Sequence, residues 1–514
     1  MNRVDLLIAL PAALLTIGMT ANPIPGTAAP MPAPGSVASY YVEGGEPLWH
    51  GSRQARKRLR NYLTVLESLP EIGLDPIAYD GHIIATLVRQ RAWRQLEATA
   101  SDSFSRLATD LADGAISAEI DFTEEELAGR SAKKAEFLER LQRGENPDDL
   151  LEDVASSNPL QDGLIAALKR YRRYAAEDAF QEVSLSGDIL EEGDSGEDVV
   201  AVAERLRAEG FLTLPLDRTE DGEALFGPVL ADALESFQMS RGITPDGIVG
   251  PNTLTRMNES EEALVDQLIL NIERSRWLPS DFGEQHVFVN IAAYDVAMQK
   301  GRDFVAMRTV VGTERNETPV FAAKMSYVVV NPYWNVPESI LRAEIAPKAA
   351  EDRSYLGSKN YEVVSGWQDP QPYRGRIDWD NLPDNLPFRV RQRPGPTNAL
   401  GRIKFMFPND YAVYLHDTPA DQLFGEAQRA FSHGCIRLER PLDFADWVFG
   451  VAADKAPPIE EILKTGEETR VILDREIPVY VTYMTARAEG ETVYFYEDIY
   501  DRDQAVLDRL RAGS

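Results

Sequence analysis

The sequence predicts a multidomain α+β protein, with a helical N-terminal region, a small three-helix unit and a mostly β domain that carries an insertion. Its 514 residues exceed what one hydrophobic core serves. Apolar residues follow a helical period before residue 258 and form short β-rich runs after residue 285. With 44% hydrophobic and 26% charged residues, the composition is that of an ordinary globular protein.

The charge balance excludes some partners. The chain has 83 acidic and 53 basic residues, a formal charge of −30. Because phosphate binding needs clustered Lys and Arg, a nucleic-acid partner is disfavoured. Simple electrostatic adhesion to an anionic surface is disfavoured for the same reason. A polyanionic or wall-like partner would have to be held by shape and hydrogen bonds.

The N-terminus reads as a targeting segment. An apolar run extends from Leu6 to Met19, and small residues follow. This length is typical of a secretory signal and short for a membrane span. We therefore expect residues 1–29 to be a signal peptide or, alternatively, an uncleaved N-terminal anchor, which would be the protein's one link to a membrane. Both interpretations place the bulk of the protein outside the cytoplasm, and the Pro- and Ala-containing residues 30–37 read as a linker.

Residues 38–187 are predicted to form a helical domain. Leu59, Tyr62, Leu63 and Leu66, for example, recur at helical spacing. No group of residues in this segment points to catalysis. A scaffold role is therefore the default interpretation.

Residues 188–258 are predicted to form a compact three-helix unit. Tight turns at Pro245-Asp246-Gly247 and Gly250-Pro251 separate short helices. Together with the preceding Phe237-Gln238, this pattern resembles the small helical peptidoglycan-binding domain found beside many wall enzymes. The alternative is a helical spacer that has lost ligand binding.

Residues 265–485 are predicted to form the mostly β domain, with strands that include residues 412–415 and 479–484 and a helix over residues 459–465. The pattern lapses over residues 337–394, which contain a helix-like stretch and many Pro, Gly and Asn residues. An insertion of this size is a candidate lid over the active site. A surface segment without such a role explains the pattern equally well. The C-terminal extension, residues 486–514, reads as strand, turn, strand and helix.

The single cysteine of the chain, Cys435, directly follows Gly434, and two of the chain's five histidines, His416 and His433, precede it. An exported protein with one cysteine forms no internal disulfide, so a reactive or intermolecular thiol is indicated. A nearby imidazole generates and holds the thiolate that attacks a carbonyl. His416 ends a strand-like segment and is expected to reach Cys435 across a sheet.

The residues next to Cys435 suggest further roles. His433 lies two residues away, either on the same side of an extended chain or holding the loop. Gly434 allows close backbone approach, and its N–H and that of Cys435 would stabilise an oxyanion. Arg437 would bind a substrate carboxylate in a bidentate fashion.

Two other interpretations stay open on residue types alone. A single cysteine is often a small buried hydrophobe. His416, His433 and Cys435 would also supply three zinc ligands, although a bare His-x-Cys fits the usual paired spacings poorly.

A family resemblance adds to this reading. His416 followed by Ser432-His433-Gly434-Cys435-Ile436-Arg437 resembles the signature of L,D-transpeptidases with a YkuD-type catalytic domain. Further stretches are similar to the large multidomain members of that family: residues 271–279, 318–321, 331–337 and 394–409. The similarity covers nearly all of residues 38–485 in the order scaffold, wall-binding domain and catalytic domain with a capping insertion. One mild departure is Ser275, where an aromatic residue is more usual.

The resemblance implies a reaction. Cys435 would attack the third residue of a peptidoglycan tetrapeptide stem, releasing terminal D-alanine and leaving a thioester. An amine of a neighbouring stem would then form a 3–3 cross-link, with His416 as proton donor and acceptor. The remaining motif residues would shape the oxyanion and carboxylate contacts: Ser432, His433, Gly434 and Arg437.

The resemblance also implies acylation by carbapenems and action in the periplasm or cell wall, without a metal or cofactor. Two alternatives remain from the sequence. One is an L,D-carboxypeptidase, in which water replaces the acceptor amine. The other is a non-catalytic wall-binding protein.

Overall fold

The structure is a computed structural model that describes residues 37–42, 45–116, 134–155, 158–453 and 455–512. The predicted signal or anchor and nearly all of the predicted linker lie outside these residues. No helix formed by the described residues is long and apolar enough to cross a membrane.

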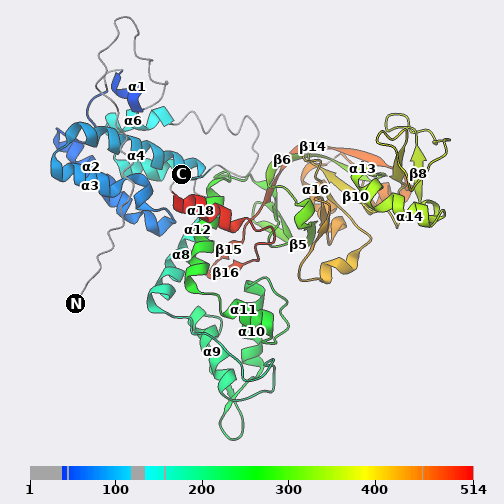
Figure 1. The fold of residues 1–514 in the computed structure, drawn as a ribbon, viewed down its shortest axis with the longest axis horizontal. Helices are drawn as coiled ribbons and strands as arrows, with labels where there is room; N and C mark the ends of the chain where they lie inside the picture. Colours follow the sequence, from blue (N-terminus) through cyan, green and yellow to red (C-terminus); the bar gives the residue numbers. More distant parts are fainter. Residues whose placement is uncertain (1–36, 43–44, 117–133, 156–157, 454, 513–514) are drawn as a thin grey trace, which may run out of the picture.

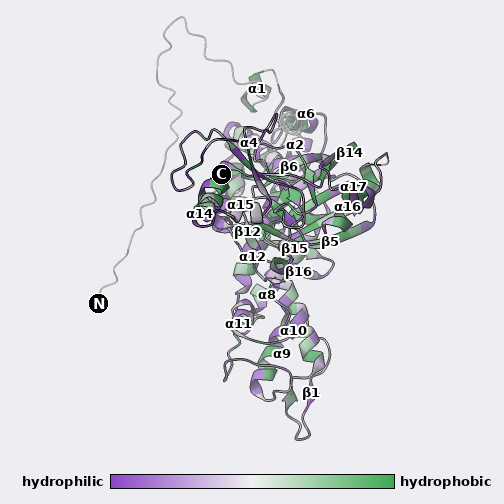
Figure 2. Ribbon diagram, turned by 90° about the vertical axis from the view of Figure 1, so that its right-hand side faces the viewer, coloured by the Kyte–Doolittle hydropathy of each residue, from purple (hydrophilic) through white to green (hydrophobic). Residues whose placement is uncertain are grey.

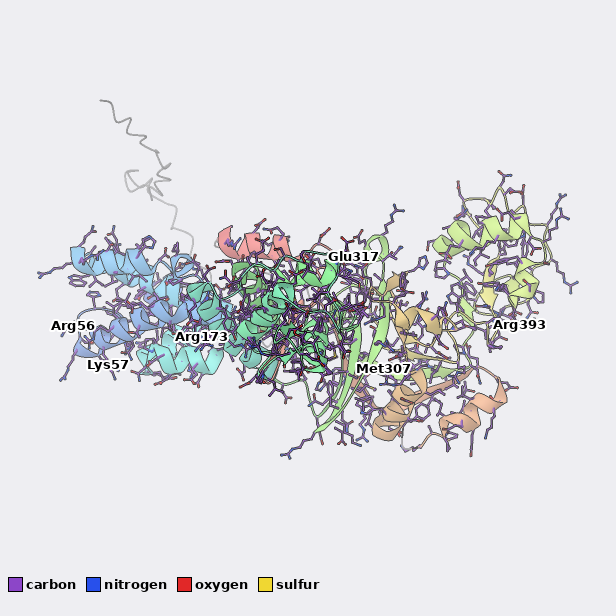
Figure 3. All side chains as sticks on the ribbon, turned by 90° about the horizontal axis from the view of Figure 1, so that it is seen from below. Arg56, Lys57, Arg173, Met307, Glu317 and Arg393 are labelled. Carbon is purple, nitrogen blue, oxygen red and sulfur yellow. The ribbon has the colours of Figure 1, made fainter. Side chains whose placement is uncertain are left out.

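The predicted multidomain α+β architecture is confirmed. The helical region and the insertion lie at opposite ends of the long axis, with the β domain between them, and the three-helix unit projects to one side (Figure 1). Seen from below, Arg56 and Lys57 lie at one end of the molecule and Arg393 near the other (Figure 3).

The helical region has its own hydrophobic core. It includes Tyr62, Leu96, Phe104 and Leu107, all of which are buried. Its helices are α1 (Val37–Val42), α2 (Arg53–Ser68), η1 (Leu69–Ile72), η2 (Pro76–Tyr79), α3 (Gly81–Gln90), α4 (Trp93–Asp113), α6 (Lys134–Gln142) and α7 (Pro147–Val154). One continuous helix was expected from Ile83 to Leu96, but the chain breaks at Arg91, which has a φ of 58° and ends α3.

A second core joins elements that are far apart in the sequence. Its elements are α8 (Pro159–Glu177), α12 (Glu261–Arg276), β15 (Ala486–Glu489) and β16 (Thr492–Phe495). Leu168, Leu268 and Phe495 are all buried in this core. Helix α18 (Asp503–Ala512) follows the hairpin and contacts α12 through Arg511, whose guanidinium lies 2.6 Å from the Asp266 carboxylate. Helix α8 therefore packs with the C-terminal segment rather than with the core of the helical region.

The three-helix unit projects below the rest of the molecule (Figure 2). It contains α9 (Glu197–Glu209), β1 (Asp217–Arg218), β2 (Ala224–Leu225), α10 (Pro228–Ser240) and α11 (Pro251–Met257). Proline opens α10 and α11, because the first helical N–H has no partner within the helix in any case. Buried apolar side chains, among them Val202, Leu234 and Phe237, form its core.

The β domain is built on a mixed sheet. Its strands among the described residues are β3 (Gln285–Asn290), β4 (Asp295–Lys300), β5 (Asp303–Gly312), β6 (Phe321–Val330), β10 (Ile403–Met406), β11 (Leu415–His416), β12 (Ala430–Ser432), β13 (Ile436–Leu438) and β14 (Thr469–Thr482). They are ordered β12-β5-β13-β11-β10-β6-β14-β3-β4. Because β4 also pairs with β5, the sheet closes on itself, and β12 is attached beside β5.

Helix α16 (Pro441–Ala452) packs against this sheet and contributes Phe444 and Val448 to the main core. A 3-10 turn, η3 (Glu314–Asn316), follows β5, and η5 (Asp421–Gly425) and α17 (Ile459–Thr465) complete the domain. Helix α17 begins and ends at the predicted residues.

The insertion forms a small layer with its own core, which includes Val336, Leu341 and Phe388. Its elements are β7 (Trp334–Asn335), α13 (Glu338–Ile340), the π-helical turn η4 (Leu341–Ile345), α14 (Ala346–Glu351), α15 (Tyr355–Ser358), β8 (Tyr361–Val364) and β9 (Arg389–Gln392). Strands β7, β9 and β8 pair in that order, separately from the main sheet.

Candidate active site

Strand register brings His416 and Cys435 to the same face of the β domain. Strands β11 and β13 are parallel, with His416 opposite Arg437. The N–H of Ile436 donates to the carbonyl of Tyr414 at 3.1 Å, so the pairing continues to Tyr414 and Cys435. Cys435 lies one strand across from His416 and two residues along, so their backbones are about 8 Å apart. Imidazole and thiol side chains can span this distance.

Alternation along the strands explains why these side chains share a face. Leu415 and Ile436 are buried in the main core. Their neighbours along the strands point the other way, because successive side chains of a strand alternate. Tyr414, His416 and Arg437 therefore lie on the face opposite the core.

The imidazole of His416 is held in one tautomer. Its Nδ1 lies 2.6 Å from the carbonyl oxygen of Asp417. A carbonyl only accepts, so Nδ1 carries the hydrogen and Nε2 keeps its lone pair. Nε2 is the atom that a general base requires.

The loop after His416 is fixed by the Asp417 carboxylate. This carboxylate accepts the N–H groups of Arg402 and Thr418, each at 2.7 Å. At Gly401 a Cβ would lie 2.3 Å from the carboxyl carbon, so only glycine fits there. The carboxylate thus positions the carbonyl that orients His416.

Burial keeps both reacting groups neutral. Burial and, after it, the charge of the nearby Arg437 guanidinium lower the pKa of His416 to about 3. Burial raises the pKa of the Cys435 thiol, while hydrogen bonds from Tyr414 and the charge of Arg437 oppose the rise. The resting pair at neutral pH is therefore thiol and neutral imidazole.

Two cationic side chains, Arg437 and Lys404, lie near the thiol. The sequence had pointed only to Arg437. Lys404 on β10 lies opposite His416, and its Nζ is 5.8 Å from the ring centre of Tyr414. Burial lowers the pKa of Lys404 and of Arg437, and the charge of Cys435 raises both. The buried Nε of Arg437 has no hydrogen-bond partner among the described residues. In the sequence, Lys404 stands between the apolar Ile403 and Phe405. This alternation was the signal that could have placed Lys404 on the face opposite the core.

The loop between β12 and β13 is built around Ser432. Its Oγ donates to the carbonyl of Cys435 at 2.5 Å and accepts the N–H of Gly434 at 3.0 Å. Gly434 has a φ of 106°, a conformation that favours glycine. The N–H of Gly434 is engaged, and that of Cys435 has no acceptor among the described residues. The oxyanion role of these two N–H groups stays a prediction, and Cys435 offers the free donor.

A buried chain of hydrogen bonds ties this loop to the C-terminal segment. Thr318 Oγ1 donates to the carbonyl of Gly434 at 2.9 Å and accepts the N–H of Gly312 at 2.9 Å. The N–H of Thr318 donates to the phenol of Tyr500 at 3.2 Å, which donates in turn to the carbonyl of Gly312 at 2.7 Å. Sequence reasoning missed Tyr500, because nothing near it marks it as more than a core residue.

His433 contacts the insertion. Its side chain is 46% exposed, and Nε2 lies 2.8 Å from the carboxylate of Glu344 in the insertion. The structure thus brings His416, Arg437 and Cys435 together and places His433 at the contact with the insertion. The zinc interpretation finds no support, since the described residues contain no cluster of three His, Cys, Asp or Glu side chains that could hold a metal.

Sizeable cavities occur away from the thiol. One of about 1180 Å³ lies in the helical region, beside His50 and Trp93. Another of about 740 Å³ lies between the three-helix unit and the β domain. The two cavities therefore do not contain Cys435 or His416. We place the candidate active site at these two residues because of their chemistry, not because of cavity size.

Three family models match the chain in separate segments. Residues 284–472 match the L,D-transpeptidase catalytic domain, YkuD. Residues 36–168 match a scaffold domain. Residues 195–257 match a domain described as "putative peptidoglycan binding domain".

One curated relative is a "putative L,D-transpeptidase" of Haemophilus influenzae, 34% identical over 247 residues. The match covers 48% of this chain, and the chain spans about half (50%) of the relative's length.

Solved structures show weaker likeness. An L,D-transpeptidase of Xylanimonas cellulosilytica has 14% identity and a TM-score of 0.17, covering 58% of this chain and all (100%) of that chain. A fused Zn-dependent amidase/peptidase/peptidoglycan-binding domain-containing protein of Clostridium acetobutylicum has 12% identity and a TM-score of 0.16, covering 57% of this chain and 99% of that chain. These low scores carry no argument on the fold.

The motif residues all fall within the first of the three matched segments. The site geometry described above therefore belongs to that segment. The chain carries a catalytic domain of the YkuD L,D-transpeptidase family, together with a scaffold domain and a peptidoglycan-binding domain.

Proposed function

We propose that the protein is an L,D-transpeptidase that forms 3–3 cross-links in peptidoglycan through a thioester on Cys435. The observation that carries the proposal is the oriented, neutral imidazole of His416 on the same face of the sheet as the only thiol of the chain. A thiol, a base and an oxyanion donor suffice for covalent acyl transfer in two steps.

In the first step, Cys435 Sγ attacks the carbonyl carbon of the third stem residue. The thiol proton passes to His416 Nε2 and then to the amine of D-alanine, which leaves as its C–N bond breaks. In the second step, the side-chain amine of another stem attacks the thioester carbon. His416 takes the proton of that amine and returns it to the departing sulfur.

The two cations give this site its preference for an acidic peptide. Arg437 has an unpaired, buried Nε, and the buried Lys404 lies on the neighbouring strand across His416. A stem carboxylate would satisfy both charges and form charge-assisted hydrogen bonds. Both cations also favour the thiolate, since they oppose the rise in the Cys435 pKa.

The insertion would cap the substrate. Glu344 reaches the loop of Cys435 through His433, and its charge also acts on Arg437. Deleting residues 337–394 should lower turnover more than wall binding. Equal loss of both would instead indicate a folding defect.

Purified tetrapeptide muropeptides test the reaction. We expect dimers with 3–3 links, free D-alanine, and an acyl adduct on Cys435 in intact-protein mass spectra. Cys435→Ala should lack the adduct and the products. Tripeptides without dimers would favour the L,D-carboxypeptidase alternative, in which water resolves the thioester.

A carbapenem distinguishes an enzyme from a wall-binding protein. We expect a covalent carbapenem adduct on wild-type Cys435 and none on Cys435→Ala. No adduct on the wild type would favour a non-catalytic role. Action in the periplasm or cell wall follows from the targeting segment predicted for residues 1–29, and fractionation of cells producing the full chain would test it.

A further inference from the structure

We propose that the cleft between the three-helix unit and the β domain binds the uncharged amino-sugar chain of peptidoglycan, rather than its peptide stems. This inference rests on the proposed function and adds to it a second site and its ligand class. The cleft has a volume of about 740 Å³, within the usual range of ligand sites. One wall is the turn segment Gly242–Asp246, whose motif resembles peptidoglycan-binding domains, and the other includes Gly425–Arg429.

The cleft is preformed because the two walls are packed against each other. The buried guanidinium of Arg241 lies between two rings, 4.6 Å from the centre of Phe237 and 5.0 Å from that of Phe495. Phe237 belongs to the three-helix unit and Phe495 to β16. A Cβ at Gly242 would lie 3.1 Å from the ring of Tyr496, so the backbone approaches closely there.

The positive charges of the cleft are already used by the protein. The Arg429 guanidinium donates to backbone carbonyls, at 2.9 Å to Glu426 and 3.2 Å to Thr309. Arg308 donates to Glu439 at 2.8 Å through Nε, and Arg256 pairs with Glu259. Each lining guanidinium thus already has an acceptor in the protein, and the lining carboxylates of Asp246, Glu426 and Glu497 disfavour binding of a stem carboxylate.

What the cleft offers instead is neutral hydrogen-bonding groups and rings. Thr244, Asn252 and Thr255 are exposed on the wall formed by the three-helix unit. Tyr294 and Tyr496 line the wall formed by the β domain. Hydroxyl, amide and aromatic groups suit an uncharged, N-acetylated sugar chain, which presents hydroxyls, amides and apolar ring faces.

The cleft is connected to the thiol by a short stretch of chain. Residues 425–429 lead into β12, and the carbonyl of Arg429 accepts the N–H of Val311 at 2.9 Å. The six residue-to-residue steps from Arg429 to Cys435 span at most about 21 Å, and an extended tetrapeptide spans about 14 Å. A sugar chain in the cleft thus holds its own stems near the thiol.

Binding of the N-acetylglucosamine hexamer, an uncharged probe, tests this inference by titration calorimetry on the full chain. Thr244→Ala and Asn252→Ala each remove a neutral hydrogen-bonding group from an exposed position in the cleft. The double variant should bind the hexamer at least about tenfold more weakly, since each lost hydrogen bond costs about 1 kcal/mol. Thr213→Ala is the matched control, because Thr213 is exposed on the same unit and does not line the cleft. This variant should bind like the wild type.

Three results would overturn the proposal. The first is that the hexamer binds the Thr244→Ala/Asn252→Ala double variant as it binds the wild type. The second is that it does not bind the wild type, and the third is that a free tetrapeptide displaces it. Acylation of Cys435 by soluble tetrapeptide should be unchanged in the double variant. Failure of that acylation in the wild type would refute the proposed reaction and leave the hexamer result to decide the cleft.

Discussion

The Glu344 carboxylate lies 2.8 Å from Nε2 of His433, a contact that joins the insertion to the loop of Cys435. Both side chains are about half exposed, at 40% and 46%. A pair of this exposure contributes about 0.2–1 kcal/mol. The contact therefore positions the insertion without locking it.

The first prediction follows from this pair. In a double-mutant cycle with Glu344→Gln and His433→Gln, the rate of Cys435 acylation by tetrapeptide should show a coupling of about 0.2–1 kcal/mol. The coupling should shrink as salt is added, since exposed charges are screened. Glu351→Gln, an exposed change in the same insertion, serves as control. A coupling well above this range would mean that the pair takes part in the chemistry.

The second prediction concerns Thr318. Thr318→Val removes the hydroxyl that donates to the Gly434 carbonyl and accepts the Gly312 N–H. Leaving these buried groups unpaired should lower the free energy of unfolding by about 1–3 kcal/mol. Acylation of Cys435 should slow as well, because the loop loses its brace. Chemical denaturation and stopped-flow mass spectrometry measure the two effects.

Tyr500→Phe should reproduce part of this loss through the C-terminal segment. It removes the phenol that accepts the Thr318 N–H and donates to the Gly312 carbonyl. Tyr494→Phe, on the nearby hairpin but outside this chain of hydrogen bonds, should leave acylation unchanged. Equal rates in both variants would show that the C-terminal segment does not position the loop.

The third prediction is a pH dependence of stability. Folded His416 has a pKa of about 3, below its ordinary value of 6.5. Between these values the unfolded chain binds the extra proton, so the free energy of unfolding decreases as pH falls from 6.5 towards 3. The decrease from this residue is at most about 5 kcal/mol, at about 1.4 kcal/mol per pH unit.

Urea denaturation at pH 7 and pH 4 measures this effect. His416→Gln cannot titrate, so its unfolding free energy should decrease less between the two pH values than that of the wild type. Identical decreases in the two proteins would show that His416 is not the buried neutral group inferred here.

The fourth prediction concerns a buried charge cluster in the three-helix unit. The carboxylate of Glu209 lies between Arg205, at 2.9 Å, and Arg241, and its side chain is only 2% exposed. Glu209→Ala would leave the buried Arg205 guanidinium without its counter-charge and Arg241 with only the Glu259 carboxylate, 3.9 Å from its Nε. Such a loss costs about 3–5 kcal/mol. Glu204→Ala, an exposed change on the same helix, should cost less than about 0.5 kcal/mol. A similar small cost for Glu209→Ala would mean that water reaches the two arginines.

The sequence predicted elements well where one local signal dominated. Helix α17 matches its predicted residues because a Pro-Pro pair precedes it and Gly466 ends it with a φ of 66°. The expected strand over residues 412–415 is shorter, since Ala412 adopts a φ of 56°. Strand β14 is longer than predicted, because its pairing with β6 continues beyond the apolar run.

The same contrast applies to the candidate active site. The sequence by itself indicated the candidate thiol, the candidate histidine and the glycine loop, because those residues lie within one short motif and one strand end. Only the tertiary structure decided that Lys404 lies across His416, that Glu344 meets His433 and that Tyr500 braces the Gly434 loop. These partners come from a neighbouring strand, an insertion and the C-terminal segment. Strand register and packing bring them together, and neither leaves a periodic signal along the chain.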